Sequence, residues 1–463
     1  MSTETAAVTT TPIAPPTSGR AWTILALGVG AQAAGTVFIN TPAFLIPFLH
    51  TERGLTLAEA GLLASAPTLG MVFALIAWGA LADRIGERWV IAASLSLTAI
   101  ATVAAIVALD AVTIGEAAQA RAGGAGADEG ASSLGDYWLV GVLLLLGGMA
   151  SAGTNSASGK IVVGWFAKER RGLAMGIRQM AVPLGATIAA VTVPTIAAAG
   201  AGDAVKDSIL WSGAGAALAV PLVINAVFAI VCAIAIRNPP MPARTVRVAG
   251  AGAQVAGTGA GAGAPPPVDH NPYRGSSFLW RIHAVSILLV VPQFTLSTFA
   301  LVWLVAGLGW EPLAAGVLVG AAQFVGAIGR ILVGVLSDRV GSRVRPLRWV
   351  ALSGTAVMLL LALAGFLDRD AFVAVMIVVA TTVAVADNGL AFTSVAEASG
   401  PRWSGRALGV QNTGQYIAAS IVGPAVGALI GLVGYPLAFA VIALCPIIAV
   451  PIVPRADVER ETA

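Results

Sequence analysis

Long apolar segments recur along almost the whole chain, and they limit what it can fold into more than any other feature. A helix needs about 20 mostly apolar residues to cross a bilayer, and the sequence contains twelve segments of this kind. We interpret each as a membrane-spanning helix, which predicts an all-α membrane protein. The segments lie at 21–47, 57–81, 89–109, 137–161, 173–199, 209–236, 283–307, 312–336, 347–366, 371–395, 406–431 and 433–453.

The composition supports this interpretation and removes several function classes. Only 11% of the residues are charged, whereas soluble domains have about 25%. Cys232 and Cys445 lie in apolar segments, so we expect small hydrophobic side chains rather than a disulfide scaffold. The three histidines are scattered, which predicts no metal site. A net charge of +3 does not indicate nucleic-acid binding, and we expect no cofactor.

Polar and low-complexity segments divide the chain. Residues 1–20 are polar and rich in Pro and Thr, which predicts a disordered tail. The Gly/Ala/Pro-rich segment 237–280 is expected to be a flexible linker. It separates one predicted six-helix bundle, 21–236, from a second, 281–453, and residues 454–463 form a short tail.

The distribution of Lys and Arg predicts the orientation. With both termini in the cytoplasm, 19 of these residues lie on cytoplasmic segments, 4 on external segments and 3 within spans. The opposite orientation contradicts the positive-inside rule. The acidic segment 115–136 then lies outside, and we expect a multi-pass monomer in the cell membrane with both termini cytoplasmic.

The second half of the chain repeats the first. A shift of 255 aligns residues 60–88 with 315–343 without a gap, and it places Asp83 on Asp338. A shift of 233 aligns 171–179 with 404–412. In that register Asn155 corresponds to Asn388, and Arg178 to Gln411. Corresponding spans match in the same orientation, so the sequence predicts two six-helix pseudo-repeats, as in transporters whose halves rock about a central site.

A charged ten-residue segment follows the second span of each half, and it carries a family resemblance. The chain resembles the Major Facilitator Superfamily (MFS), whose Gly-x-Leu-x-Asp-Arg-x-Gly-x-Arg loop connects spans two and three. The resemblance implies that fold and transport by alternating access. The loop residues are Gly79, Leu81, Asp83, Arg84, Gly86 and Arg88 in the first copy, and Gly334, Leu336, Asp338, Arg339, Gly341 and Arg343 in the second.

These loops are expected to act in gating rather than in substrate binding. Gly79 and Gly334 are predicted to let the helix end pack tightly, and Gly86 and Gly341 to permit a turn that other residues resist. The resemblance implies that Asp83 helps to latch the outward-facing state. The alternative is that the loops fix only topology and turn geometry.

Arg178 is the conspicuous cation within a span. It lies six residues after Gly172, roughly 9 Å into the fifth span, and Gln179 follows it. Two interpretations are open: the planar guanidinium binds a carboxylate or another oxyanion of the substrate, or it satisfies helix-end carbonyls or reaches the membrane surface. The segment 165–185 also resembles a sequence motif of family members that carry small anions and organic acids. The signature motifs of the family's nitrate carriers do not occur in this sequence.

Asp387 is the carboxylate that we place deepest in a span, beside Asn388. Burial disfavours the charged form of a carboxylate, so Asp387 is our candidate for proton coupling. A static partner for Arg178 or for another cation is the alternative.

Span eleven carries a polar stripe, which is expected to face the bundle interior. It lines a cavity or bonds to another helix. Lys160 and Arg330 are expected to reach the membrane surface near the ends of their spans. The stripe consists of Gln411, Asn412, Gln415, Tyr416 and Ser420, and further polar candidates are Gln32, Asn40, Asn155, Gln293 and Gln323.

The sequence therefore predicts a secondary active transporter of a small solute, and we favour an organic or inorganic anion. The alternative is a multidrug efflux transporter, and a non-transporting membrane sensor ranks below both. No nucleophile–base or metal constellation indicates an enzyme. We expect the lipid bilayer and a small-molecule substrate as partners.

Overall fold

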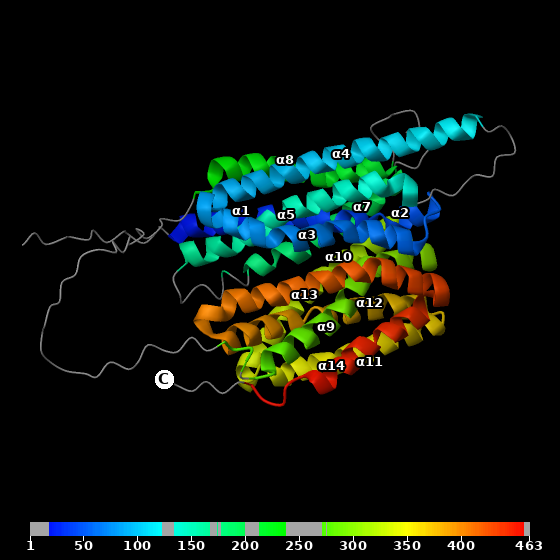
Figure 1. The fold of residues 1–463 in the computed structure, drawn as a ribbon. Coiled ribbons are helices and arrows are strands. Elements are labelled where there is room, and N and C mark those ends of the chain that lie inside the picture. The colour runs from blue at the N-terminus through cyan, green and yellow to red at the C-terminus, as the bar shows by residue number, and fades with distance from the viewer. Residues whose placement is uncertain are drawn as a thin grey trace, which may run out of the picture.

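The chain folds into two helical bundles that lie side by side (Figure 1). The computed structural model describes residues 18–122, 134–166, 174, 177–199, 213–237, 271–274 and 276–457, and every regular element in these ranges is a helix. The predicted all-α fold is therefore confirmed. Most of the predicted linker and of both predicted tails lies outside the described residues.

The N-terminal half contains α1 (Ser18–Phe44), α2 (Ile46–Thr51), α3 (Leu57–Ile85), α4 (Glu87–Ala122), the 3₁₀-helix η1 (Leu134–Tyr137), α5 (Trp138–Trp165), α7 (Ala181–Ala199) and α8 (Gly213–Ala235). The C-terminal half contains α9 (Phe278–Val302), the short π-helix η4 (Trp303–Gly307), α10 (Pro312–Val340), α11 (Val344–Phe366), α12 (Asp370–Ala384), α13 (Asp387–Ile442) and α14 (Leu444–Ile452).

Eleven helical ranges in the described part of the chain are long and apolar enough to cross a membrane. The last of them, Ala407–Ile452, has 46 residues and a length of about 69 Å, more than twice the roughly 30 Å of a hydrocarbon core. Gly434 within it has a φ of 77°, which interrupts a right-handed helix. This range therefore covers the last two predicted spans. Both ends of the described chain lie on the same side of the molecule, as an even number of crossings requires (Figure 1).

The repeat seen in the sequence extends to the starts of helices. Thr56 caps α3: its side chain accepts from the backbone N–H of Glu59, whose side chain accepts from the N–H of Thr56. Glu311, which corresponds to Thr56 under the shift of 255, caps α10 by accepting from the N–H groups of Leu313 and Ala314. The N–H groups in the first turn of a helix have no partner within the helix. In both halves a side chain at the corresponding position, Thr56 or Glu311, accepts hydrogen bonds from them.

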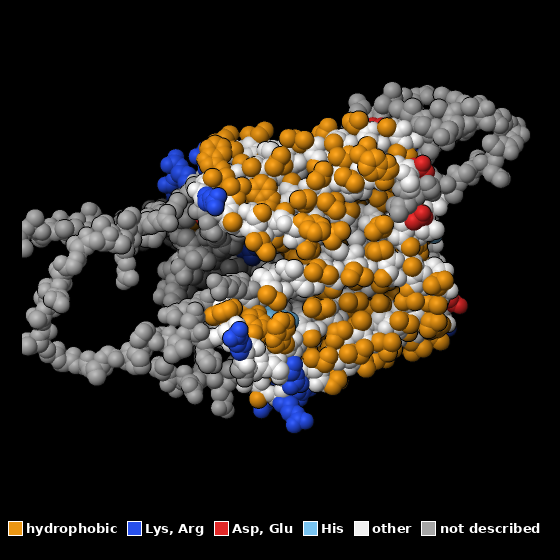
Figure 2. Space-filling view, viewed as in Figure 1, with side chains coloured by type: hydrophobic (Ala, Val, Ile, Leu, Met, Phe, Trp, Pro, Cys, Tyr) orange, Lys and Arg blue, Asp and Glu red, His pale blue; other side chains and the backbone are white. Residues whose placement is uncertain are grey.

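Apolar side chains cover the outer surface of both halves (Figure 2). Ile76, Ile234 and Leu432 are 78%, 73% and 82% exposed, which is the expected arrangement where lipid rather than water surrounds the protein. The structure thus has a surface suited to the bilayer, one large buried core to which both halves contribute, and a smaller core within each half.

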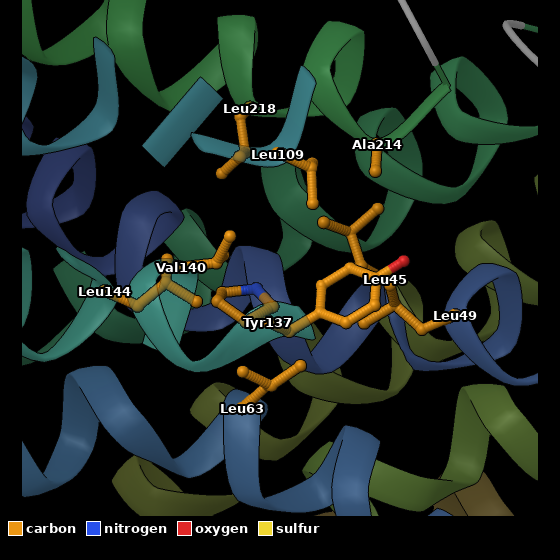
Figure 3. Close-up of a pocket in the computed structure, with 10 residues that line it drawn as sticks. Leu45, Leu49, Leu63, Leu109, Tyr137, Val140, Leu144, Ala214 and Leu218 are labelled. Atoms are coloured by element: carbon orange, nitrogen blue, oxygen red, sulfur yellow. The ribbon is translucent and has the colours of Figure 1, made fainter. Parts of the chain in front are cut away.

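A small void in the N-terminal half belongs to this core rather than to a ligand site. It has a volume of about 20 Å³ and an apolar lining from α2, α3, α4, α5 and α8 together with Tyr137 (Figure 3). Apolar voids of this kind stay dry. Leu45, Leu49, Leu63 and Leu109 point into it (Figure 3).

Helix α4 is much longer than the span predicted at 89–109. It has 36 residues and a length of about 54 Å, and it extends past the rest of the bundle (Figure 1). Its last turns take up the beginning of the predicted loop 115–136, of which residues 123–133 lie outside the described part of the chain.

Candidate functional site

A cluster of polar side chains connects α1, α5 and the helical turn before α7 in the N-terminal half. Arg178 donates from Nε to the Ser158 hydroxyl at 2.9 Å, and from Nη2 to the Asn155 carbonyl and side-chain oxygens, both at 2.9 Å. Gln32 donates to the same Asn155 side chain at 3.3 Å and accepts from Ser158 at 2.9 Å. The guanidinium is therefore held in a fixed orientation by neutral oxygen atoms of α5, whose side chains are held in turn by Gln32 of α1.

Arg178 lies where the two halves meet. It lies near Tyr416 of α13, and Tyr416 packs against Met71, Ala74 and Ala152 of the N-terminal half. Arg178 also donates to Gln179 at 3.3 Å, and the Gln179 side chain is exposed. The structure thus brings four of the predicted candidates, Arg178, Gln179, Asn155 and Tyr416, into one region.

A second polar cluster lies between α9 and two parts of α13, its first turn and the region around Gln415. Asn388 donates to Gln293 at 2.8 Å, and Gln415 donates to Asn388 at 3.1 Å and to Ser286 at 2.6 Å. Gln415 and Ser286 are buried, so these side chains satisfy one another within the C-terminal half.

The two clusters share one pair and differ in charge. Asn155 and Asn388 correspond under the shift of 233, and each forms a hydrogen bond with a glutamine on the first long helix of its own half. The counterpart of Arg178 is Gln411, which is buried and bonded to Nδ1 of His283. Nε2 of His283 contacts the Tyr273 hydroxyl at 3.0 Å.

Asp387 lies beside the second cluster but does not face it. The residue is fully buried, and neither carboxylate oxygen has a hydrogen-bond partner within the described structure. The cation that interacts with it electrostatically is Arg330 of α10. Arg330 was expected to reach the membrane surface, but its Nε donates to the carbonyl oxygen of Val385 at 3.1 Å, because α10 packs closely against α12 here.

Close backbone contacts join the halves at one end of the molecule, which we call the closed end (Gly61, Gly423, Gly316 and Ala190). A Cβ atom on Gly61 would overlap the carbonyl oxygen of Gly423, and one on Gly316 would overlap that of Ala190. Gly61 corresponds to Gly316 under the shift of 255, and Ala190 to Gly423 under the shift of 233. One contact therefore occurs twice, once on each side of the interface.

The opposite end of the molecule carries Gly79 and Gly334, and we call it the open end; no such contact occurs there among the described residues. Gly79 and Gly334 were expected to let the helix end pack tightly, but a Cβ atom on either would meet no described atom within 4 Å. Figure 2 shows the surface hollowed between the halves at this end, where the described Arg side chains gather. Among the described residues the halves are apart here, so neither glycine has a described neighbour to pack against.

The two repeated loops lie at the open end. Gly86 and Gly341 have φ values of 84° and 65°, in the region that favours glycine. Arg343 forms an ion pair with Asp338 at 2.6 Å and lies 3.6 Å from Glu397. Burial lowers the pKa of Arg343, but its hydrogen bonds and its charge interactions with these two carboxylates outweigh burial and raise the pKa above its usual value. Arg343 therefore remains charged.

The remaining loop residues make other contacts. Arg88 donates to the Ala233 carbonyl of α8 at 2.7 Å, and Arg84 and Arg339 are exposed. The side chains of Asp83 and Lys160 lie outside the described residues. The backbone N–H groups of Arg343 and Val344 donate to Asp457 at 2.9 and 3.1 Å, so the described end of the chain is bound to the second loop.

Comparison with known proteins identifies the fold and the family. The model of the Major Facilitator Superfamily matches residues 25–423. The chain belongs to the Major Facilitator Superfamily. An uncharacterized MFS-type transporter of Mycobacterium tuberculosis strain H37Rv is 40% identical over 436 residues, which cover 94% of this chain and 85% of the relative. Its counterpart in strain CDC 1551 is equally similar.

Solved MFS structures share the fold at low sequence identity. A bacterial homolog of the human lysosomal transporter Spinster, in an inward-facing and unoccupied conformation, has a TM-score of 0.67 and 16% identity, with 94% of this chain and 96% of that chain covered. The D-xylose-proton symporter has a TM-score of 0.69 and 14% identity, with 94% and 98% covered. The chain is thus a multi-span membrane transporter of small molecules, and members of this family are not enzymes.

Not every candidate from the sequence joins the two clusters. Asn40 donates to the Thr36 carbonyl of its own helix at 2.9 Å, and Asn412 is partly exposed beside the buried Gln411. Sequence reasoning missed Ser158 and His283. Ser158 lies three residues after Asn155, on the same helix face, so this spacing could have identified it.

Proposed function

We propose that this MFS protein moves a small organic or inorganic anion by alternating access, with proton coupling or exchange. The observation that carries the proposal is the Arg178 guanidinium, oriented by Asn155 and Ser158 at the meeting point of the two halves. A charge within a bilayer is expensive and marks a functional site by default. A planar, bidentate donor suits a carboxylate or another oxyanion.

The substrate is proposed to lie between the halves. Arg178 supplies the charge, Asn155 and Ser158 hold its orientation, and Gln32 holds Asn155 and Ser158 in turn. The exposed Gln179 and, from the facing half, Tyr416 and Asn412 supply polar contacts. Asn388, Gln411 and Gln415 are proposed to shape the C-terminal wall, Asn40 extends the polar surface of α1, and Asp387 is the proposed proton carrier.

Alternating access requires two arrangements of the halves. Contact at the closed end and separation at the open end support the proposal that this arrangement faces inward. The Arg side chains at the open end support a cytoplasmic location for that end under the positive-inside rule. We further propose a monomer in the cell membrane, built from bundles 21–236 and 281–453, with both termini in the cytoplasm and the repeated loops, Asp83 included, acting in gating.

A thermal-shift screen tests the proposal. The purified protein is heated with a panel of carboxylates, phosphate, sulfate, organic cations and neutral drugs, alongside Arg178→Ala, Arg178→Lys and the exposed control Arg345→Ala. A ligand at 100 times its Kd stabilises the native state by about 2.7 kcal/mol. We expect an anion to stabilise the wild type and Arg345→Ala, to stabilise Arg178→Lys weakly, and to leave Arg178→Ala unchanged.

The opposite pattern would favour the alternative function. If only cationic or neutral compounds stabilise the protein, and Arg178→Ala responds as the wild type does, the anion assignment is wrong and multidrug efflux becomes the better proposal.

A further inference from the structure

We infer that Arg330 is the positioning residue for the Asp387 carboxylate, and that this pair sets the geometry of a break within the tenth span. The inference rests on the proposed role of Asp387 as proton carrier, and it does not depend on the substrate being an anion. Four observations support it: the break, the contact made by Arg330, the surroundings of Asp387 and its position next to Asn388.

The tenth span, Asp370–Ser399, is not one continuous helix. Helix α12 ends at Ala384 and α13 begins at Asp387, so Val385 and Ala386 form a turn inside the span. Breaks at membrane depth leave backbone groups that need partners from elsewhere in the protein. Transporters use such discontinuous helices at substrate and ion sites. Asp387 is the first residue after the break.

Arg330 supplies one of those partners. Its Nε donates to the Val385 carbonyl at 3.1 Å, and Val385 is the C-terminal cap of α12. Helix α10 lies close to the break. A Cβ atom added to Gly326 would lie only 2.9 Å from Val385 Cγ2, and one added to Gly329 only 2.9 Å from Thr382 Cγ2. Arg330 follows Gly326 by one helical turn, so it extends from the face of α10 that contacts the break.

The surroundings of Asp387 are otherwise apolar. It borders a cavity of about 10 Å³, at the lower limit for one water molecule. Helix α9 contributes Leu289 and Pro292 to the lining, and α14 contributes Pro446. Helix α11 contributes Val350, Gly354, Val357 and Met358, and α12 contributes Ala380, Val383 and Ala384. Among the described residues that pack here, the charged partner is therefore Arg330 alone, from α10.

Two states of the carboxyl group follow from this arrangement. The carboxylate is buried with no side-chain hydrogen bond among the described residues, so it depends on the positive charge of Arg330, since an uncompensated buried charge is strongly destabilising. Uptake of one proton gives the neutral acid, which fits the apolar cavity and releases that dependence. Asn388 is the next residue and belongs to the second polar cluster, so a change at the break is expected to move a side chain of the proposed substrate region.

The experiment is a double-mutant cycle on the purified full-length protein. The melting temperature is measured for the wild type, Arg330→Gln, Asp387→Asn and the double variant, with Arg345→Gln as the exposed-arginine control, at several pH values. We expect Arg330→Gln to lower the melting temperature by several degrees. The double variant should recover at least half of that loss, because the unpaired carboxylate is then absent. The deficit of Arg330→Gln is also expected to shrink as the pH falls, because protonation removes the same charge.

Two results would overturn the inference. If the losses of the two single variants simply add and the Arg330→Gln deficit is independent of pH, Arg330 only satisfies the Val385 carbonyl. If Arg330→Gln does not fold, the double variant decides: its folding supports the pair, and its failure beside a folded Asp387→Asn contradicts it. The response of Arg178→Ala to anions tests the proposed substrate separately, so the two proposals can fail independently.

Discussion

The two halves of this transporter have the same polar pair but not the same charge. In the N-terminal half the Gln32–Asn155 pair adjoins Arg178, whereas in the C-terminal half the Gln293–Asn388 pair adjoins the neutral amide of Gln415. The contacts at the closed end, in contrast, are matched on the two sides of the interface. The repeat therefore conserves the contacts between the halves and departs from symmetry at the proposed substrate region.

This difference separates two requirements of the fold. Contacts that bring the halves together must form on both sides of the interface, so Gly61 and Gly316 occupy corresponding positions. A single solute between the halves has no such symmetry, and one cation on one side is sufficient to orient it. Substitutions at these two kinds of position should therefore have different consequences.

The largest expected effect comes from breaking the matched contacts. Gly61→Ala or Gly316→Ala places a methyl group against the backbone of the facing half. Overpacking of this kind costs about 1–3 kcal/mol, which corresponds to a roughly 5- to 150-fold shift between the two arrangements of the halves. Spin labels at Glu52 and Asp370, in a background without the native cysteines, should report a longer distance between the two halves.

Gly79→Ala and Gly334→Ala are the matched controls, since neither position has a described neighbour within 4 Å. Both should leave the label distance unchanged. Equal lengthening in all four variants would mean that the contacts at the closed end do not hold the halves together.

A smaller effect sharpens the difference in charge. Arg178→Gln makes the N-terminal half resemble the C-terminal half, and anion-dependent stabilisation should disappear. Adding Gln411→Arg places the cation at the corresponding position of the other half, but we expect no recovery, because Gln411 is 1% exposed and bonded to His283. The melting temperature with and without the anion measures both variants, and recovery in the double variant would show that the halves are interchangeable.

The smallest effect concerns the second loop. Asp338→Asn removes the ion pair with Arg343, in which the Asp338 side chain is 69% exposed. Exposed pairs contribute about 0–1 kcal/mol, and salt screens them. We therefore expect a small loss of melting temperature at low ionic strength that vanishes at high salt. A large loss that persists in high salt would mean that Asp338 has a structural role beyond this ion pair.

The fold was accessible from the sequence because its causes are local or repeated. Apolar length fixes the spans, and two sequence shifts fixed the correspondence of the halves. The same shifts relate the Thr56 and Glu311 caps and the contacts at the closed end, although these were recognised only in the structure. The predicted spans 406–431 and 433–453 divide close to Gly434, where the structure turns. The end of α4 shows the limit, since apolar length does not predict how far a helix continues into a polar segment.

The candidate site was accessible only in part. Arg178 and Asp387 stand out because charges are rare in apolar segments, and Asn155 and Asn388 stand out through the repeat. Arg330 was misread because its position near a helix end suggested a surface residue, whereas its contact depends on how closely α10 packs against α12. His283 gave no signal, since its partners Tyr273 and Gln411 lie on other segments of the chain. The packing role expected of Gly79 and Gly334 depends on the conformation, which a sequence does not specify.

The unusual length of α4 has a practical consequence. A helix that continues past the bundle offers a rigid point of attachment, with a direction set by the bundle itself. A small folded protein joined in register to its end, or an antibody fragment raised against it, would rotate together with the N-terminal half. Such a fiducial would help to align particle images in electron microscopy, and it would mark the movement of one half relative to the other.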